Sequence, residues 1–222
     1  VWHTNAGCSL LNQDEVTMGD IFLDAGYETG LFGKWHLGDN YSFLPEQRGF
    51  KETFYHKGGG VGQTPDYWNN NYQDDIYFRN GEPEESKGYC TDVFFDEAIS
   101  FINKNKENPF LCFLSLNAPH SPFNVPKEYY ELYENEIDLL ESQKRFYGMI
   151  TNIDDNFGRL HQHVESLGIL DNTIIIFTTD NGTSNGYKYS KKDKKWLGFN
   201  AGMRGTKTCL LYTSPSPRDA SQ

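Results

Sequence analysis

Three short polar segments of this sequence carry side chains that could act on an anion, and Lys34 and His36 form the first. They stand on either side of Trp35 in the run Gly-Lys-Trp-His-Leu-Gly. In an extended segment residues two apart point to the same side, so Lys34 and His36 would face one spot while Trp35 packs elsewhere. A cation beside an imidazole suits the binding and protonation of an oxyanion. For one such pair alone, a solvated lysine beside a structural histidine is the simpler interpretation.

The second segment places His120 between two prolines, Pro119 and Pro122. Proline fixes its own φ angle, so the backbone around His120 is stiff enough to aim the imidazole in one direction. A proline-rich stretch is also typical of an ordinary loop, and these residues alone leave both interpretations open.

Asp180 and Asn181 form the third segment, and Gly182 follows them. A carboxylate and an amide oxygen side by side are hard ligands, which suit Ca²⁺ or Mg²⁺ better than a soft transition metal. Asp-Asn-Gly is also a favoured turn sequence in any protein. These residues alone therefore leave both interpretations open, and their position in the fold is needed to distinguish a ligand pair from a turn.

The elements that precede the three polar segments are predicted to be strands. Each is a short run of apolar, aromatic or β-branched residues, which is typical of strands in a sheet. The three runs are Tyr27–Phe32, Phe110–Leu116 and Thr173–Thr179. The last two are almost continuously apolar, so we expect them to be buried on both faces of the sheet.

Helices are predicted before and between these strands, because apolar residues recur there at helical spacing. The first is capped by Thr17, where Asp20 completes a capping box, and ends at Gly26. The second begins at Thr91 and stops before Pro109, and the third spans residues 146–167.

Strands separated by long helices predict right-handed crossovers, and therefore an α/β fold with a mostly parallel sheet sandwiched by helices. In such sheets, ligands bind beyond the carboxyl ends of the strands. Each of the three polar segments follows one predicted strand. The site is therefore expected at this edge of the sheet.

The stretch from Gly58 to Asp75 contains two further features. Its glycine run, residues 58–62, fits neither the spacing of a dinucleotide-binding loop nor that of a phosphate loop, so we interpret it as a flexible surface loop. The residues after it include Tyr67, Trp68 and Tyr72. Their rings could contact a sugar at the rim of a site or pack together as a cluster.

The overall charge restricts the partners that the chain could bind. Its 222 residues include 20 Lys and Arg against 31 Asp and Glu, which gives a formal net charge of −11. This balance argues against a broad basic face for nucleic acid or anionic lipid, but it allows a local anion pocket. No apolar run approaches the roughly 18 residues that a membrane span needs.

Four segments together resemble the sulfatase family, in the order in which that family carries them. They are Gly26–Gly38, Ala118–Phe123, Thr179–Gly182 and Gly202–Lys207. Gly-Lys-Trp-His-Leu-Gly is highly specific, whereas Asp-Asn-Gly alone is weak. The resemblance is to arylsulfatase-like members, and it implies the alkaline-phosphatase-like α/β fold and the hydrolysis of sulfate esters.

The resemblance implies roles for four basic residues. Lys34 and Lys207 would contact the sulfate and stabilise negative charge on its oxygens as the S–O bond breaks. His36 would hydrogen-bond the nucleophile and help the sulfated intermediate to collapse. His120 would contact the sulfate and favour protonation of the leaving alcohol.

The resemblance also implies a calcium site and a modified nucleophile. Asp180 and Asn181 would ligate Ca²⁺, with Mg²⁺ as the less expected ion, and the metal would act as a Lewis acid and template. The family nucleophile is a formylglycine made from the Cys of a Cys-x-Pro-Ser-Arg motif. Cys8 lacks the Pro and the Arg of that motif. The formylglycine, and the Asp pair that completes the calcium site, are therefore expected upstream.

Because the nucleophile motif of the family is missing, we predict a partial sulfatase catalytic domain over residues 1–207. It lacks the nucleophile and is by itself expected to be inactive. The Ser/Pro-rich tail 208–222 departs from the family pattern and is expected to be non-native or disordered.

Two other functions stay open on the sequence alone. Phosphodiesterases and phosphonate hydrolases of the same superfamily share the strand-end Asp, but an Asp-His pair would favour them where Asn181 stands. A degenerate, non-catalytic sulfatase-like binding protein is the other alternative. The expected partner is a small-molecule or glycan sulfate ester, with no nucleic acid and no membrane span. The resemblance implies secretory, lysosomal or periplasmic localisation.

Overall fold

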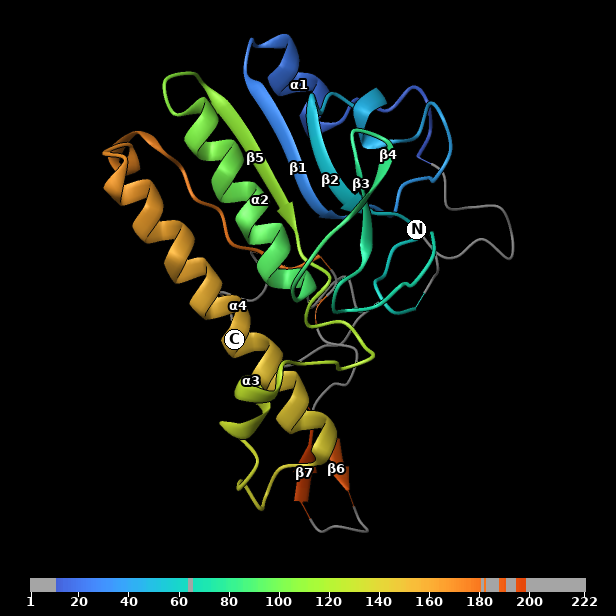
Figure 1. Cartoon of the computed structure of the whole chain (residues 1–222), viewed down its shortest axis with the longest axis vertical. Coiled ribbons are helices and arrows are strands. Elements are labelled where there is room, and N and C mark those ends of the chain that lie inside the picture. The colour runs from blue at the N-terminus through green and yellow to red at the C-terminus, as the bar shows by residue number, and fades with distance from the viewer. Residues whose placement is uncertain (1–10, 64–65, 181, 183–187, 191–194, 199–222) are drawn as a thin grey trace, which may run out of the picture.

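The computed structural model describes residues 11–63, 66–180, 182, 188–190 and 195–198 (Figure 1). The elements in chain order are α1 (Met18–Asp24), β1 (Glu28–Lys34), the 3-10 helix Pro45–Gln47, β2 (Glu52–His56), β3 (Ile76–Arg79), β4 (Glu82–Glu85), α2 (Cys90–Asn105), β5 (Phe110–Ser115), α3 (Lys127–Glu131), α4 (Glu141–Ser166), the 3-10 helix Leu170–Asn172, β6 (Lys188–Ser190) and β7 (Lys195–Leu197).

Five strands form one mixed sheet in the order β4-β3-β2-β1-β5. β1 pairs in parallel with β2 on one side and with β5 on the other, whereas the β2–β3 and β3–β4 pairs are antiparallel. The arrowheads of β1, β2 and β5 point toward the same edge of the sheet in Figure 1, so their carboxyl ends lie together. The predicted α/β class and the parallel centre of the sheet are confirmed.

The antiparallel strands β3 and β4 do not follow from a pattern of strands separated by helices. They are joined by Asn80 and Gly81, which both have positive φ angles, of 49° and 88°. This is the geometry of a two-residue hairpin turn, for which Asn-Gly is the strongest short signal in a sequence. The hairpin could therefore have been predicted from these two residues.

The predicted start of the first helix is confirmed at α1. The Thr17 hydroxyl oxygen accepts a hydrogen bond from the backbone N–H of Asp20 at 3.2 Å, and the Asp20 carboxylate accepts one from the N–H of Thr17 at 2.9 Å. This reciprocal pair satisfies two backbone donors that the helix itself cannot.

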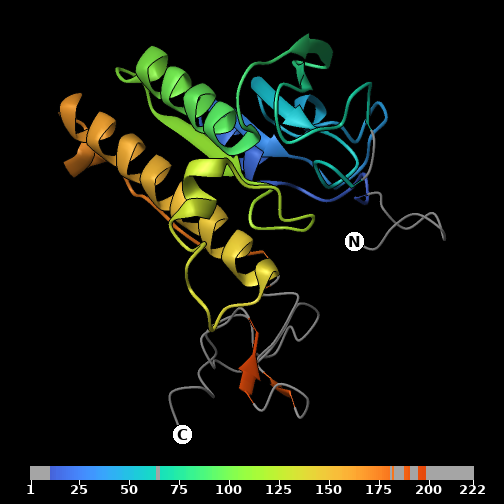
Figure 2. The same ribbon diagram turned by 60° about the horizontal axis from the view of Figure 1, so that its bottom comes forward.

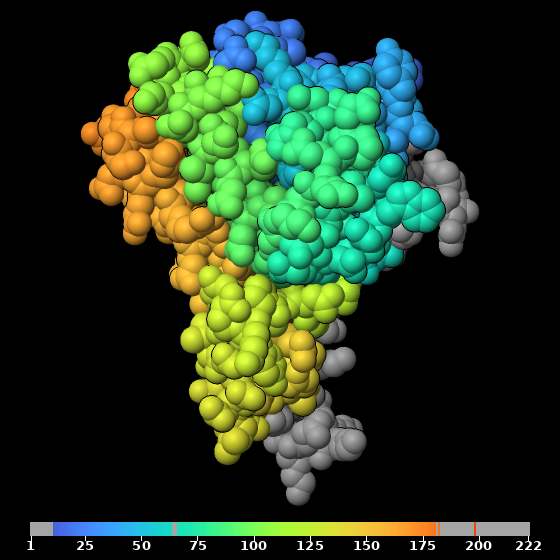
Figure 3. Space-filling view, in the orientation of Figure 1, coloured from blue at the N-terminus to red at the C-terminus, as the bar shows by residue number. Residues whose placement is uncertain are grey.

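α2 packs on one face of the sheet and builds the main core. Phe101 of this helix meets Phe32 of β1, with 5.4 Å between the ring centroids. α4 lies against α2, where Asp92 accepts hydrogen bonds from Asn152 and Asn156 at 2.7 Å each. In the space-filling view, α2 fills the surface between α4 and the β3–β4 side of the molecule (Figure 3). The two longest helices therefore lie on the same side of the sheet.

The opposite face of the sheet carries a smaller apolar cluster. Its buried members are Leu31, Trp35, Phe50, Tyr55 and Phe78. Phe113 of β5 packs on Phe50 with 6.0 Å between ring centroids, yet it is 36% exposed. Within the described residues, β5 is therefore only partly covered on this face, and the expectation that both its faces are buried is wrong.

The prediction of a third buried strand at Thr173–Thr179 is also wrong. These residues pair with no strand among the described residues, and Ile174, Ile176 and Phe177 are 89%, 80% and 73% exposed. Phe177 contacts Phe157 of α4, with 6.0 Å between ring centroids, so the segment lies against that helix. A β-branched run has strand propensity, but it becomes a buried strand only where neighbouring strands and packed side chains cover it.

A hairpin of β6 and β7 lies near the start of α4, away from the sheet (Figure 2). Gln143 of α4 donates a hydrogen bond from Nε2 to the carbonyl oxygen of Gly198 at 2.9 Å. The tail 208–222 lies outside the described residues. Among the helices that the structure describes, none is long and apolar enough to cross a membrane.

Gly33, next to the last residue of β1, allows β1 and β5 to approach closely. Its φ of +126° favours glycine, and a Cβ there would lie 2.0 Å from the carbonyl oxygen of Ser115. The Ser115 hydroxyl donates to the carbonyl oxygen of Lys34 at 2.8 Å and so joins the two strand ends. The tight pairing at this edge therefore depends on glycine at position 33.

We expect Gly33→Ala to lower the free energy of unfolding by roughly 2–5 kcal/mol, because the methyl group would clash with Ser115 and strain the backbone. Gly158→Ala in α4 is the matched control, since no neighbouring element lies within 4 Å of its Cβ position. That change should raise stability by roughly 0.5–1 kcal/mol through helix propensity. Urea unfolding of both variants measures the difference. An unchanged midpoint for Gly33→Ala would contradict the close approach.

Candidate functional site

Lys34 is the last residue of β1 and stands at the carboxyl edge of the sheet, opposite His56 of β2. Its ammonium nitrogen lies 3.6 Å from Oδ2 of Asp180. The Lys34 side chain is 15% exposed and the Asp180 side chain is 65% exposed. Two of the three predicted polar segments therefore meet at this edge, although the segment that leads into Asp180 is not part of the sheet.

Trp35 packs away from the edge, as predicted, and holds the segment around it. Its ring is 5% exposed, and Nε1 donates to the carbonyl oxygens of Gly38 and Phe43 at 3.1 and 2.9 Å. Its backbone N–H donates to the carbonyl oxygen of His56 at 2.8 Å. The loop that carries His36 is thereby fixed to β2 at its start.

The glycine run 58–62 lies directly on the ring of His36. Gly59 has a φ of +81°, and a Cβ there would lie 2.3 Å from ring atoms of His36. Gly58, Gly59 and Gly60 are buried. The interpretation of this run as a flexible surface loop is therefore wrong. Glycine is required because the backbone itself forms the wall on which the imidazole packs.

Side chains from other loops hold the glycine run through its backbone amides. Asp39 Oδ1 accepts from the N–H of Gly58 at 3.0 Å, and Asn117 Oδ1 accepts from the N–H of Val61 at 3.1 Å. The N–H of Gly59 donates to the carbonyl oxygen of Trp35 at 3.1 Å. Because these buried backbone donors are satisfied, the run can be buried without regular secondary structure.

The same hydrogen-bond network reaches His120 in the loop after β5. Asn117 Nδ2 donates to the Tyr72 hydroxyl at 2.8 Å, and that hydroxyl donates to the carbonyl oxygen of His120 at 3.0 Å. His120 Nδ1 lies 2.8 Å from the carbonyl oxygen of Ser121, so Nδ1 carries a proton. Asn117 and Tyr72 thus join the loop under His36 to the loop of His120. Nothing in the spacing of these two residues along the chain signals this role.

The aromatic residues after the glycine run divide between the two predicted roles. Tyr72 is 4% exposed and stacks on Tyr89, with 6.1 Å between ring centroids. Trp68 and Tyr67 are 77% and 42% exposed. Tyr72 is therefore a packing residue, and contact with a sugar stays a prediction for Trp68 and Tyr67.

The remaining predicted site residues, Asn181 and Lys207, lie outside the described residues. Asp180 supplies one carboxylate, a hard ligand of the kind that calcium prefers. In the part of the chain that the structure describes, no three His, Cys, Asp or Glu side chains gather in a way that could hold a metal ion. Calcium takes about six to eight oxygen ligands, so Asp180 would be one ligand of a larger set.

Cys90 and Cys112 are free thiols, and burial raises the pKa of each to about 12. The thiolate is the nucleophilic form of cysteine, so neither side chain suits nucleophilic attack near neutral pH. Cys8 lies outside the described residues.

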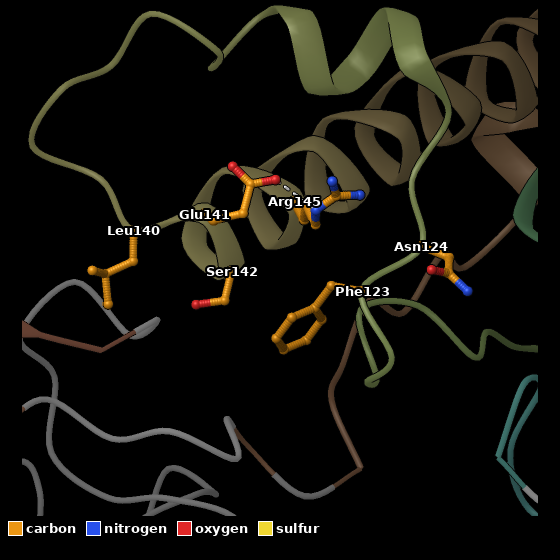
Figure 4. A pocket seen from close by; sticks show the side chains of 6 residues that line it. All are labelled: Phe123, Asn124, Leu140, Glu141, Ser142 and Arg145. Atoms are coloured by element: carbon orange, nitrogen blue, oxygen red, sulfur yellow. Dashed lines mark hydrogen bonds and ion pairs between the residues drawn. The ribbon is translucent and has the colours of Figure 1, made fainter.

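A shallow hollow lies beside the His120 loop, at the start of α4. It is lined by Phe123, Asn124, Leu140, Glu141, Ser142 and Arg145 (Figure 4). Arg145 pairs with Glu141, with 2.8 Å between Nε and Oε1. None of the predicted site residues is among the six that line this hollow.

A family model matches this chain over almost its whole length. The model of the family described as Sulfatase matches residues 2–206. The chain belongs to the sulfatase family. Sulfatases hydrolyse sulfate esters as a family, and the predicted resemblance is confirmed over most of the chain.

Curated sulfatases are similar to most of this chain but only to part of their own length. The arylsulfatase of Klebsiella aerogenes is 28% identical over 90% of this chain and 56% of its own. The uncharacterized sulfatase YdeN of Escherichia coli is 28% identical over 76% of this chain and 33% of its own. The human N-acetylgalactosamine-6-sulfatase is 28% identical over 77% and 33%. The chain thus spans between a third and little more than half of these relatives.

Solved structures show the same fold over a similar share. Ps i-CgsB is 26% identical, with a TM-score of 0.73 over 90% of this chain and 46% of that one. Its complex with k-i-k-neocarrahexaose is 28% identical, with a TM-score of 0.70 over 87% and 45%. These matches confirm the alkaline-phosphatase-like fold class.

We expect Gly59→Ala to displace the His36 ring, because the new methyl group would overlap it. Gly81→Ala is the matched control: Gly81 also has a positive φ, of +88°, but no atom lies within 4 Å of its Cβ position. Both variants should lose roughly 1–2 kcal/mol through backbone strain. Only Gly59→Ala should shift the imidazole NMR signals of His36 strongly. The same His36 signals in both variants would contradict this packing.

Proposed function

We propose that the whole protein hydrolyses sulfate esters and that the carboxyl edge of β1 and β5 is its sulfate site. One observation carries the proposal: His36 and His120 stand on two loops that a single hydrogen-bond network joins, beside Lys34 at the strand end. Membership of the sulfatase family supports the reaction class. Because the chain spans only part of its relatives, the reaction is proposed for the whole protein.

Lys34 is proposed to bind the sulfate. Its side chain is 15% exposed, so its charge is partly shielded from water and attracts an anion more strongly than a fully solvated lysine would. Lys207 is proposed as a second sulfate ligand, on the family resemblance alone. Two cations around one sulfate would stabilise the charge that develops on its oxygens as the S–O bond breaks.

His36 and His120 are proposed to handle protons. The Gly59 backbone packs on the His36 ring, and a ring held in one orientation can hydrogen-bond the same nucleophile oxygen at every turnover. His120 donates from Nδ1 to the carbonyl of Ser121. Nε2 is therefore the nitrogen that would pass a proton to the leaving alcohol.

The nucleophile is proposed to be a formylglycine, as the family resemblance implies, and it is not made from Cys8. Calcium is proposed to be held by Asp180 and Asn181 together with further oxygen ligands. When bound, the ion would supply a Lewis acid beside the sulfate oxygens. Asp180 supports this placement because its carboxylate lies at the same edge as Lys34, 3.6 Å from the ammonium nitrogen.

The substrate is proposed to be a sulfated carbohydrate. Trp68 and Tyr67 present exposed rings on the stretch that follows the glycine run under His36. Large, exposed aromatic rings suit contact with the apolar faces of sugar rings. The structure of Ps i-CgsB with k-i-k-neocarrahexaose supports an oligosaccharide, since it shows a similar protein with such a ligand.

We expect the whole protein to release sulfate from an aryl sulfate ester much faster than phosphate from the matching phosphate ester. Lys34→Met should lower kcat/KM for the sulfate ester by about 100-fold or more, because it removes one charge-stabilising group. Lys51→Met is the control, since Lys51 is an exposed lysine that pairs with Glu28 at the amino end of β1. It should leave kcat/KM unchanged.

Two outcomes would overturn the proposal. Sulfate binding without any release of sulfate would favour a non-catalytic binding protein. Faster release of phosphate than of sulfate would favour the phosphodiesterase and phosphonate hydrolase class.

A further inference from the structure

His56 is a buried polar residue behind the glycine run, and the reaction proposed above does not use it. It ends β2, is 0% exposed, and stands opposite Lys34 in the parallel register. A buried imidazole is costly unless it is hydrogen-bonded. Its Nε2 lies 3.2 Å from Oδ1 of Asp66 and 3.0 Å from Oδ1 of Asn70. Both partners belong to the stretch that follows the glycine run.

These two partners determine which nitrogen of His56 carries a proton. Asn70 Oδ1 also accepts from the N–H of Gly62 at 2.8 Å, which fixes the orientation of the Asn70 amide. A carboxylate oxygen and an amide oxygen then face Nε2, and both are acceptors. Nε2 must therefore be a donor.

The same two partners hold both ends of the glycine run. Asp66 Oδ2 accepts from the backbone N–H of Lys57 at 2.7 Å, just before the run, and Asn70 binds Gly62 at its end. The Asp66 side chain is 2% exposed, and burial raises its pKa while His56 and Lys57 act in the opposite direction. The N–H of His56 thus connects Asp66 and Asn70, the two side chains that bind the two ends of this loop.

Residues 57–62 contact His36 directly and are linked to His120 through two other side chains. Gly59 forms the wall for the His36 ring, and Val61 binds Asn117, which connects through Tyr72 to the His120 carbonyl. A displacement of residues 57–62 would therefore act directly on the His36 ring, and on the loop of His120 through Asn117 and Tyr72.

We propose that His56, acting through Asp66 and Asn70, is a positioning residue for His36 and His120. The inference rests on the proposed function, which gives the places of those two rings their importance. The competing description is a core histidine that only stabilises the fold. The two descriptions differ in what happens to the two rings when His56 loses its donor.

The test uses the 222-residue chain and the imidazole NMR signals of its histidines. His56→Leu removes the donor, whereas His56→Gln keeps an N–H close to the position of Nε2. We expect His56→Leu to shift the ring signals of His36 and His120, and His56→Gln to return them toward their original positions. A lower urea midpoint with both rings unmoved would overturn the inference.

Asn70→Gly is a second variant, in case leucine at position 56 prevents folding. Asn70 has a φ of +48°, which glycine adopts readily, so the change removes the acceptor that His56 and Gly62 share. Asn69→Gly is the matched control at a neighbouring residue with a φ of +81°. We expect Asn70→Gly, and not Asn69→Gly, to shift His36 and to weaken the binding of inorganic sulfate several-fold. A folded Asn70→Gly chain with unchanged His36 and His120 signals would overturn the inference.

Failure of the proposed function would give a different result. If sulfate shifts no signal of the original chain, while Asn70→Gly still moves both rings, the positioning role is supported and the sulfate site is not. If sulfate binds the original chain and Asn70→Gly alike, and the rings do not move, the positioning role is wrong and the sulfate site stands.

Discussion

The close approach of β1 and β5 at Gly33 is the constraint on which the rest of this site depends. A side chain at that position would overlap the carbonyl of Ser115, so only glycine lets the two strand ends lie this close. Ser115 then binds the carbonyl oxygen of Lys34 and ties the end of one strand to the other. Because the strands are parallel, the chain leaves both at the same edge. Lys34 ends one strand, His36 follows it, and His120 follows the other strand. Residues more than eighty positions apart in the sequence are thereby brought to one place.

The glycine run after β2 connects the two loops at this edge. Its backbone packs on His36, and its amides bind Asp39 and Asn117, so it acts as a buried spacer between the loops. This run of glycines does not have the spacing of a phosphate loop, and its physical role here is different: any side chain at Gly59 would occupy the space of the His36 imidazole. The net charge of −11 argues against a broad anion-binding face but allows a local anion site at Lys34.

Local signals in the sequence predict much of this fold. The Thr17–Asp20 capping box, the apolar spacing of α2 and α4, and the apolar run of β5 all depend on neighbours along the chain, and all are confirmed. Thr173–Thr179 fails because burial of a strand depends on partners that local propensity cannot reveal. The sequence does not predict the burial of the glycine run, for a related reason. It also does not predict the links through Asn117, Tyr72 and His56. Each is a bond between a side chain and a backbone or side-chain group distant in sequence, which exists only once the sheet has formed.

The most direct measurement is the position of a sulfate analogue in crystals of the chain. Selenate has the shape and charge of sulfate, and its selenium atom can be located by anomalous diffraction. We expect one well-occupied selenate within hydrogen-bond distance of the Lys34 ammonium, at the carboxyl ends of β1 and β5. Selenate bound only at other places, with Lys34 still paired to Asp180, would contradict an anion site at this edge of the sheet.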